Sequence, residues 1–303
     1  MADLSVDLGF LQLQNPVIAA SGTFGYGLEF SPYLDPNNLG GFVVKGLYFY
    51  PREGNPPPRL GETPCGILNS IGLQGIGVKK FVREILPQIR KYQTPIIINV
   101  CGEEDQEYVS VVEFLNQHPG ISAYELNISC PNVKKNGRCP ALDPQDTFSI
   151  VRAVKKVSSL PLITKLSPNV TDIVEIALSA QQAGTDALSL VNTFLAMDVD
   201  PQTRKPTLAN IYGGLSGPAI KPIALRMVHQ VAQNVGIPVI GMGGIMSGED
   251  ALEYLIAGAR AVEVGTANFV DPESTVKIIN QMKKYCEQKG IPRIESVVGS
   301  LKI

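Results

Sequence analysis

The sequence predicts an α/β protein of the (β/α)8 TIM-barrel class. Eight short apolar segments are each bounded by Gly, Pro or Asn, which is typical of parallel strands covered on both faces. Segments with the helical period lie between several of them. A chain of 303 residues with 44% hydrophobic side chains has room for one such barrel, as a single domain over residues 1–303. An open, doubly wound sheet is the alternative.

The predicted elements cover most of the chain. The strands are expected at residues 17–20, 41–45, 95–100, 122–128, 161–166, 187–191, 238–241 and 261–265. The helices are expected at residues 81–92, 147–158, 172–183, 221–234, 247–257 and 272–288. Ahead of the first strand, residues 4–8 and 10–13 alternate apolar and polar around Gly9, which predicts an N-terminal β-hairpin at the bottom of the barrel.

Two connections are too long for a single crossover helix. They cover residues 46–94, after the second predicted strand, and residues 192–237, after the sixth. Both begin at the carboxyl end of a strand, the face on which barrel enzymes build their active sites. We therefore predict functional insertions at that face and not separate domains.

Charge and apolar content exclude several function classes. The 26 basic and 28 acidic residues give a formal net charge of -2, without a basic cluster, so nucleic acid is not an expected partner. The longest apolar runs are far shorter than the roughly 20 residues that span a bilayer, and residues 1–7 lack the pattern of a signal peptide. The expectation is a cytoplasmic protein that does not associate with membranes.

The cysteines and histidines do not predict a metal site. The five cysteines are scattered and include no Cys-x-x-Cys pair, which argues against a disulfide framework, a zinc site and an iron–sulfur cluster within this chain. The two histidines, His118 and His229, lie in a turn and in a helical pattern. They are best explained as surface or packing residues, so we expect neither a Ser/His/Asp triad nor bound metal.

Polar residues end five of the predicted strands, and a buried ammonium or amide is costly unless it has a partner. The carboxyl ends of barrel strands meet at one rim, so five such residues together indicate a polar ligand with anionic and amide-like groups. One of them alone would be an ordinary capped side chain. The five residues are Lys45, Asn99, Asn127, Lys165 and Asn192.

Two glycine-rich turns follow the last two predicted strands. They are Gly241-Met-Gly-Gly244 and Gly265-Thr266. Barrels commonly build phosphate sites from the backbone N–H groups of these two loops, and glycine lets the backbone come close to phosphate oxygens. Either motif alone could be an ordinary turn; together they predict phosphate binding.

One cysteine has a setting suited to catalysis. Cys130 lies in Asn127-Ile-Ser-Cys-Pro-Asn132, just beyond a strand end and before a proline. A thiol has a reference pKa of about 8.5, so a modest lowering or closure of a loop would let it act as a general base near neutral pH. Cys101 also lies near a strand end, but in an apolar context typical of a small packing residue.

The motifs together resemble those of one enzyme family along nearly the whole chain. They include Glu125-Leu-Asn-Ile-Ser-Cys-Pro-Asn-Val133, Lys165-Leu-Ser-Pro-Asn169, Asn69-Ser-Ile-Gly-Leu73, Gly213-Gly-Leu-Ser-Gly217 and Gly241-Met-Gly-Gly244. With these motifs in this order along the sequence, the chain resembles the class 1 dihydroorotate dehydrogenases, which are flavoenzymes of pyrimidine (UMP) biosynthesis. The resemblance implies that Cys130 takes a proton from C5 of dihydroorotate while a hydride passes from C6 to FMN.

The resemblance also implies which residues form the site. Besides the base Cys130, it gives catalytic roles to Lys45 and Lys165. It implies that one FMN is held by Ser21, Lys45, Gly46, Asn99, Asn127, Lys165, Val191, Gly217, Gly243, Gly244, Gly265 and Thr266. It implies that dihydroorotate or orotate is held by Lys45, Asn69, Ser70, Ile71, Gly72, Leu73, Asn127, Asn132, Asn192 and Thr193.

The subtype determines the partners. The stretches 165–173 and 215–222 resemble the B type of class 1, which passes electrons to NAD+ through a second subunit carrying FAD and a [2Fe-2S] cluster. This chain has no four-cysteine cluster motif, so those cofactors are expected only on the partner, in a heterotetramer with a dimer of catalytic chains. The alternatives are the fumarate-using A-type homodimer, a Schiff-base aldolase using Lys165, and a barrel that binds a phosphate ligand without turnover.

Overall fold

The barrel is closed. In this computed structural model, which describes residues 2–129 and 139–302, eight parallel strands pair in a ring and the last strand pairs with the first. Closure excludes the open, doubly wound alternative. The barrel strands are β3 (Val17–Ala19), β4 (Gly41–Leu47), β7 (Ile96–Val100), β8 (Ala123–Asn127), β9 (Leu162–Lys165), β10 (Ala187–Leu190), β15 (Val239–Met242) and β16 (Ala261–Val264).

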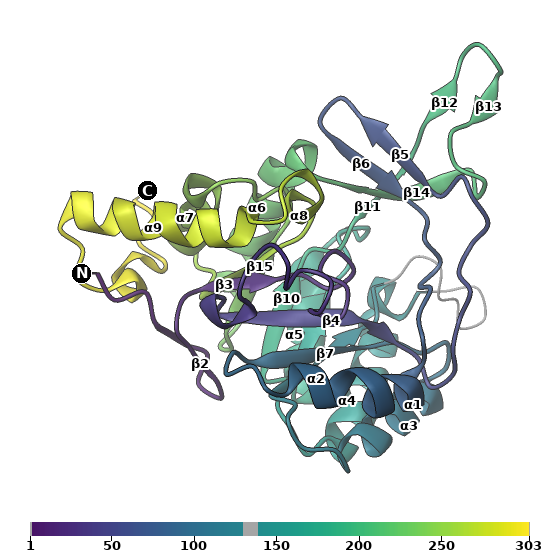
Figure 1. Cartoon of the computed structure of the whole chain (residues 1–303), viewed down its shortest axis with the longest axis horizontal. Helices are drawn as coiled ribbons and strands as arrows, with labels where there is room; N and C mark the ends of the chain where they lie inside the picture. Colours follow the sequence, from purple (N-terminus) through teal and green to yellow (C-terminus); the bar gives the residue numbers. More distant parts are fainter. Residues whose placement is uncertain (1, 130–138, 303) are drawn as a thin grey trace.

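Helices surround the ring, as the alternation of apolar segments predicts (Figure 1). They are α1 (Val78–Lys80) and α2 (Leu86–Ile89) joined by the π-helical turn η2 (Phe81–Ile85), α3 (Asp105–Leu115), α4 (Pro144–Val157), α5 (Ile173–Ala183), α6 (Lys221–Ala232), α7 (Gly248–Ile256), α8 (Ala267–Val270) and α9 (Ser274–Lys289). Short 3-10 turns complete the chain at η1 (Pro36–Asn38), η3 (Pro140–Leu142), η4 (Pro218–Ile220) and η5 (Ile294–Val297). Asp143, Asp172 and Ser247 cap the N-termini of α4, α5 and α7 with their side chains, which satisfies backbone N–H groups there.

The predicted N-terminal hairpin is present. Strand β1 (Val6–Asp7) pairs antiparallel with β2 (Gln12–Leu13) around Gly9, whose φ is 80°. The hairpin leads directly into β3, so it lies at the amino ends of the barrel strands. Val6, Leu8 and Leu13 are buried in the main hydrophobic core.

The two insertions combine into one small sheet at the opposite, carboxyl end. The first contributes β5 (Leu60–Thr63) and β6 (Gly66–Asn69); the second contributes β11 (Phe194–Met197) and β14 (Tyr212–Ser216). Their order is β11-β14-β6-β5, with the central pairing of β14 and β6 joining the two insertions. Figure 1 shows this sheet standing above the barrel, with the short hairpin of β12 (Val199–Asp200) and β13 (Lys205–Pro206) projecting beyond it.

Candidate active site

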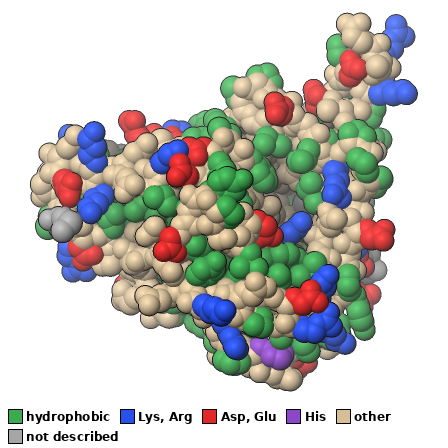
Figure 2. All heavy atoms as spheres, viewed as in Figure 1, with side chains coloured by type: hydrophobic (Ala, Val, Ile, Leu, Met, Phe, Trp, Pro, Cys, Tyr) green, Lys and Arg blue, Asp and Glu red, His purple; other side chains and the backbone are tan. Residues whose placement is uncertain are grey.

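A cavity of about 670 Å³ lies between the carboxyl ends of the barrel strands and the sheet of insertion strands. Figure 2 shows the surface hollowed in this region, with basic and acidic side chains scattered over the face that is drawn. The volume falls in the range of cofactor and small-ligand pockets, roughly 300–1,000 Å³. Within the described ranges, no helix has both the length and the apolar character needed to cross a membrane.

The five polar strand-end residues line this one cavity. Lys45 comes from β4, Asn99 from β7 and Asn127 from the end of β8. Lys165 ends β9, and Asn192 lies two residues past β10. The barrel therefore brings together side chains that are up to 147 positions apart in the sequence.

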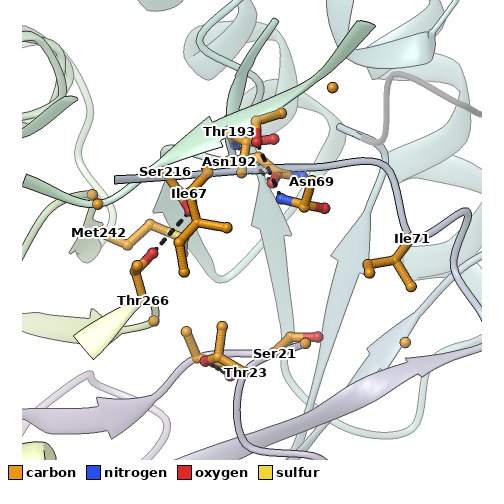
Figure 3. Close-up of a pocket in the computed structure, with 18 of the residues that line it drawn as sticks. Ser21, Thr23, Ile67, Asn69, Ile71, Asn192, Thr193, Ser216, Met242 and Thr266 are labelled. Carbon is orange, nitrogen blue, oxygen red and sulfur yellow. Dashed lines mark hydrogen bonds between the residues drawn. The ribbon is translucent and has the colours of Figure 1, made fainter. Parts of the chain in front are cut away.

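The other predicted site residues also gather here, with few exceptions. Figure 3 shows Asn69, Asn192 and Thr193 grouped on one side of the cavity, and Thr266 hydrogen-bonded to Ser216 on another. Ser70 is buried but does not line the cavity, and Cys130 and Asn132 lie outside the described residues. The lining includes Ser21, Gly46, Asn69, Ile71, Gly72, Leu73, Val191, Thr193, Gly217, Gly243, Gly244, Gly265 and Thr266.

A chain of hydrogen bonds orients the amides of the site. Asn99 Nδ2 donates to Glu125 Oε1 at 2.5 Å, and Asn127 Nδ2 donates to Asn99 Oδ1 at 3.1 Å. The hydroxyl of Ser129 donates to Asn127 Oδ1 at 3.1 Å, and Asn192 Nδ2 donates to Ser129 Oγ at 2.8 Å. An ionised carboxylate only accepts hydrogen bonds, so Glu125 at the origin of the chain fixes which way each amide points.

Lys165 lies between two buried carboxyl groups. Its Nζ is 3.4 Å from Glu125 Oε1 and 3.6 Å from Glu263 Oε2, and all three side chains are nearly inaccessible to solvent. Burial by itself would lower the pKa of Lys165, but the two carboxyl groups outweigh burial and raise it. Lys165 is therefore a permanent cation at the floor of the cavity.

Lys45 has a different environment. Burial, together with the nearby positive charge of Arg59, lowers the pKa of Lys45 below that of an ordinary lysine, while Glu29 opposes the shift. Lys45 and Arg59 both line the cavity. Two cations facing one cavity favour an anionic group between them.

Glycines allow the backbone to approach a ligand closely where Gly217 and Gly244 line the cavity. Gly244 has a φ of 69°, and a Cβ there would lie 2.8 Å from the carbonyl oxygen of Gly217. Gly217 has a φ of 100°, and a Cβ there would lie 2.7 Å from the Cα of Gly66. Neither position can carry a larger residue without displacing backbone, so both glycines are required by geometry.

Two residues of the site had not been expected from the sequence. Glu125 and Glu263 lie in the middle of apolar strands, in Tyr-Glu-Leu and Val-Glu-Val, and both are buried. An acidic residue inside a continuous apolar strand is the signal that could have identified them, because such a charge requires a partner.

Comparisons with known proteins agree with this arrangement. The family model described as Dihydroorotate dehydrogenase matches residues 3–286. The chain belongs to the dihydroorotate dehydrogenase family. Relatives named dihydroorotate dehydrogenase B (NAD(+)), catalytic subunit, include those of Bacteroides thetaiotaomicron, 50% identical with all of both chains covered, and Desulforamulus reducens, 54% identical with 98% of both chains covered.

A solved dihydroorotate dehydrogenase has the same fold. The crystal structure of the Eimeria tenella enzyme in complex with ferulenol superposes with a TM-score of 0.81 and covers 98% of this chain and 88% of that one. The two sequences are 22% identical, so this likeness bears on the fold alone. The predicted (β/α)8 barrel is confirmed by it and by the closed ring of strands.

Proposed function

We propose that this dihydroorotate dehydrogenase oxidises (S)-dihydroorotate to orotate in pyrimidine biosynthesis and that its electrons reach NAD+ through a partner subunit. The observation that carries the proposal is the convergence of Lys45, Asn99, Asn127, Lys165 and Asn192 on one cavity. Relatives of the same length that are about 50% identical bear the name of the B-type catalytic subunit, which supports the subtype.

The cavity fits FMN. The cradle of Gly217 and Gly244 has the open backbone that a phosphate group needs, and the ammonium of Lys165 suits the electron-rich edge of the isoalloxazine ring. When bound, FMN would supply the acceptor for the hydride that leaves C6 of the substrate. The residues proposed to hold it are those implied by the sequence resemblance, among them Ser21, Gly46, Gly265 and Thr266, which line the cavity.

The remaining side chains suit the substrate. Dihydroorotate combines a carboxylate with a ring of alternating amide donors and acceptors. Lys45 would bind the carboxylate, while Asn69, Asn127 and Asn192 would pair with the ring. Cys130, outside the described residues, would take the proton from C5, so that the C5 proton and the C6 hydride leave together and the C5–C6 bond becomes a double bond.

The first experiment is an anaerobic titration of the purified protein with dihydroorotate, in which the visible absorption spectrum of the protein is recorded after each addition. We expect a flavin spectrum that bleaches. A flavin that stays oxidised would reject the substrate, and a protein that fails to bind added FMN would reject the cofactor site. Adding NAD+ or fumarate to the reduced protein, with and without the partner, then separates the B-type from the A-type enzyme.

The partner is proposed to carry FAD and a [2Fe-2S] cluster, in a heterotetramer with two catalytic chains. The name of the relatives, which describes a catalytic subunit, supports the existence of a partner. Size-exclusion chromatography of the two chains expressed together should give one complex with both flavins and iron. Separate elution would contradict the proposed assembly.

The aldolase alternative is not favoured by the geometry. A Schiff-base lysine must lose its proton to attack a carbonyl, and this is achieved by a lowered pKa. The carboxyl groups of Glu125 and Glu263 instead raise the pKa of Lys165. Borohydride in the presence of carbonyl substrates should therefore trap no adduct at Lys165.

Replacing Lys45 with methionine should weaken substrate binding. A charge-assisted hydrogen bond is worth about 1.5–3 kcal/mol, so we expect KM for dihydroorotate to rise by about tenfold to a hundredfold. Because the pKa of Lys45 is lowered, the wild-type protein should lose affinity as pH rises, at a lower pH than an ordinary lysine would dictate. KM measured against pH should show this loss in the wild type, and the part of it that comes from Lys45 should be absent from Lys45→Met.

Lys205→Met is the matched control, since Lys205 is exposed on β13 and does not line the cavity. At every pH, Lys205→Met should have the same KM for dihydroorotate as the wild type. An unchanged KM in Lys45→Met as well would remove Lys45 from substrate binding.

A further inference from the structure

The cluster of Glu125, Lys165 and Glu263 contains one basic and two acidic side chains in a buried space. If both carboxyl groups were ionised, the cluster would carry a net negative charge at the floor of the cavity. Burial of an uncompensated charge is expensive, and two carboxylates near one another resist ionising together. One of the two acids should therefore keep its proton.

The hydrogen bonds indicate which acid is ionised. Glu125 accepts from Asn99 Nδ2 at 2.5 Å and from Ser189 Oγ at 2.9 Å, and it lies nearer to Lys165. Three donors surround its two oxygens, which is the environment that stabilises a carboxylate.

Glu263 lacks such donors. Neither of its oxygens has a hydrogen-bond partner among the described residues, and its one charged neighbour of opposite sign is Lys165 at 3.6 Å. The strands that flank β16 place Met242 and Ile18 directly beside it in register, and both are apolar. Glu263 also lines the cavity, so its charge state would be felt by whatever binds there.

We propose that Glu263 is a neutral carboxylic acid in the resting protein. Its proton then sets the net charge that the cluster of Glu125, Lys165 and Glu263 presents to the cofactor. Lys165 and the Glu125 carboxylate then neutralise one another, so the cluster as a whole is neutral. It would not repel negative charge that develops on a cofactor bound in the cavity. Glu263 acts through Lys165 and is thus a positioning residue. The effect of Glu263 on the cofactor rests on the proposed function, whereas the protonation of Glu263 is independent of that function.

The titratable groups around Glu263 also favour its neutral form. Burial and the negative charge of Glu125 raise the pKa of Glu263 well above that of an ordinary glutamic acid, against the opposing effect of Lys165. Lys45, on β4, lines the same cavity. Glu263 is therefore neutral below its raised pKa and ionises as pH rises through it, which places a negative charge on the cavity lining only on the alkaline side.

Infrared spectroscopy of the FMN-free protein tests the protonation directly. The C=O stretch of a protonated carboxylic acid, identified by its shift in D2O, should be present in the wild type at neutral pH and lost in Glu263→Gln. Glu125→Gln should also lose it, because Glu263 then becomes the remaining counter-ion of Lys165 in the cluster and ionises. The shorter acid therefore identifies the protonated residue: the band should shift in frequency in Glu263→Asp and keep its wild-type position in Glu125→Asp. A shift in Glu125→Asp alone would place the proton on Glu125 and overturn the proposal. Persistence of the band in Glu263→Gln, or its absence from the wild type, would overturn the proposal.

Binding of FMN tests the consequence. In the wild type the Kd of FMN should rise by about tenfold or more as Glu263 ionises at alkaline pH, since a like charge then faces the ligand. Glu263→Gln, which stays neutral, should bind FMN as tightly as the wild type at neutral pH and show a smaller rise at alkaline pH, because only the loss of charge at Lys45 then remains. Equal pH dependence in the two proteins would reject the role of Glu263; failure of both to bind FMN would instead reject the proposed cofactor site.

Discussion

Replacing Cys130 with alanine should slow reduction of the bound flavin by dihydroorotate by a factor of about 10²–10⁴, the contribution typical of a positioned general base. Binding of FMN should be retained, because Cys130 is not among the residues proposed to hold FMN and most of those residues come from other strand ends. Stopped-flow absorbance under anaerobic conditions measures the rate, and the flavin spectrum before mixing measures occupancy.

Cys65→Ala is the control for this experiment. Cys65 is exposed, in the turn between β5 and β6, and does not line the cavity. Its replacement should leave the rate unchanged. If Cys130→Ala reduced its flavin at the wild-type rate, the proton would have to leave C5 by another route and Cys130 would have no part in it.

Replacing Lys165 with methionine should reduce the free energy of unfolding by about 3–5 kcal/mol, the range for removing one partner of a buried ion pair. Glu125 would lose its counter-ion in a space closed to solvent. Denaturant unfolding of the FMN-free protein measures the change. The loss should be smaller at mildly acidic pH, where protonation can neutralise the carboxylate that has lost its counter-ion.

Lys277 offers a matched control at the surface. It also lies between two carboxylates, 2.6 Å from Asp271 and 3.1 Å from Glu273, but it is exposed. Solvent screens such pairs, so Lys277→Met should change stability little. Equal losses in the two variants would mean that burial does not determine the contribution of Lys165.

Much of the barrel could be read from local patterns. Each predicted strand overlaps an observed one, with ends that differ by at most two residues, because apolar segments bounded by Gly, Pro and Asn leave few other structures. Helix α3 was missed. Its central Val-Ser-Val-Val is typical of a strand, yet its buried residues Tyr108, Val111, Val112 and Leu115 follow the helical period.

The site was predictable to the extent that its residues end strands. Lys45, Asn99 and Lys165 each end an apolar run or lie next to its end, and barrel topology then places them together. The sheet above them was not predictable, because the pairing of Asn69 with Gly214 joins positions 145 residues apart and depends on no local pattern. The roles assigned to the individual residues stay predictions.

The shared sheet couples the two insertions in another respect. Strands β6 and β14 each cover an edge that the other would leave open, so neither insertion is a self-contained unit. A chimera that received one insertion from a relative and kept the other would bring mismatched edges together. Unpaired strand edges promote association between chains, so such a chimera would risk aggregation even with an intact barrel. Altered specificity would therefore be engineered more safely by exchanging both insertions as a pair.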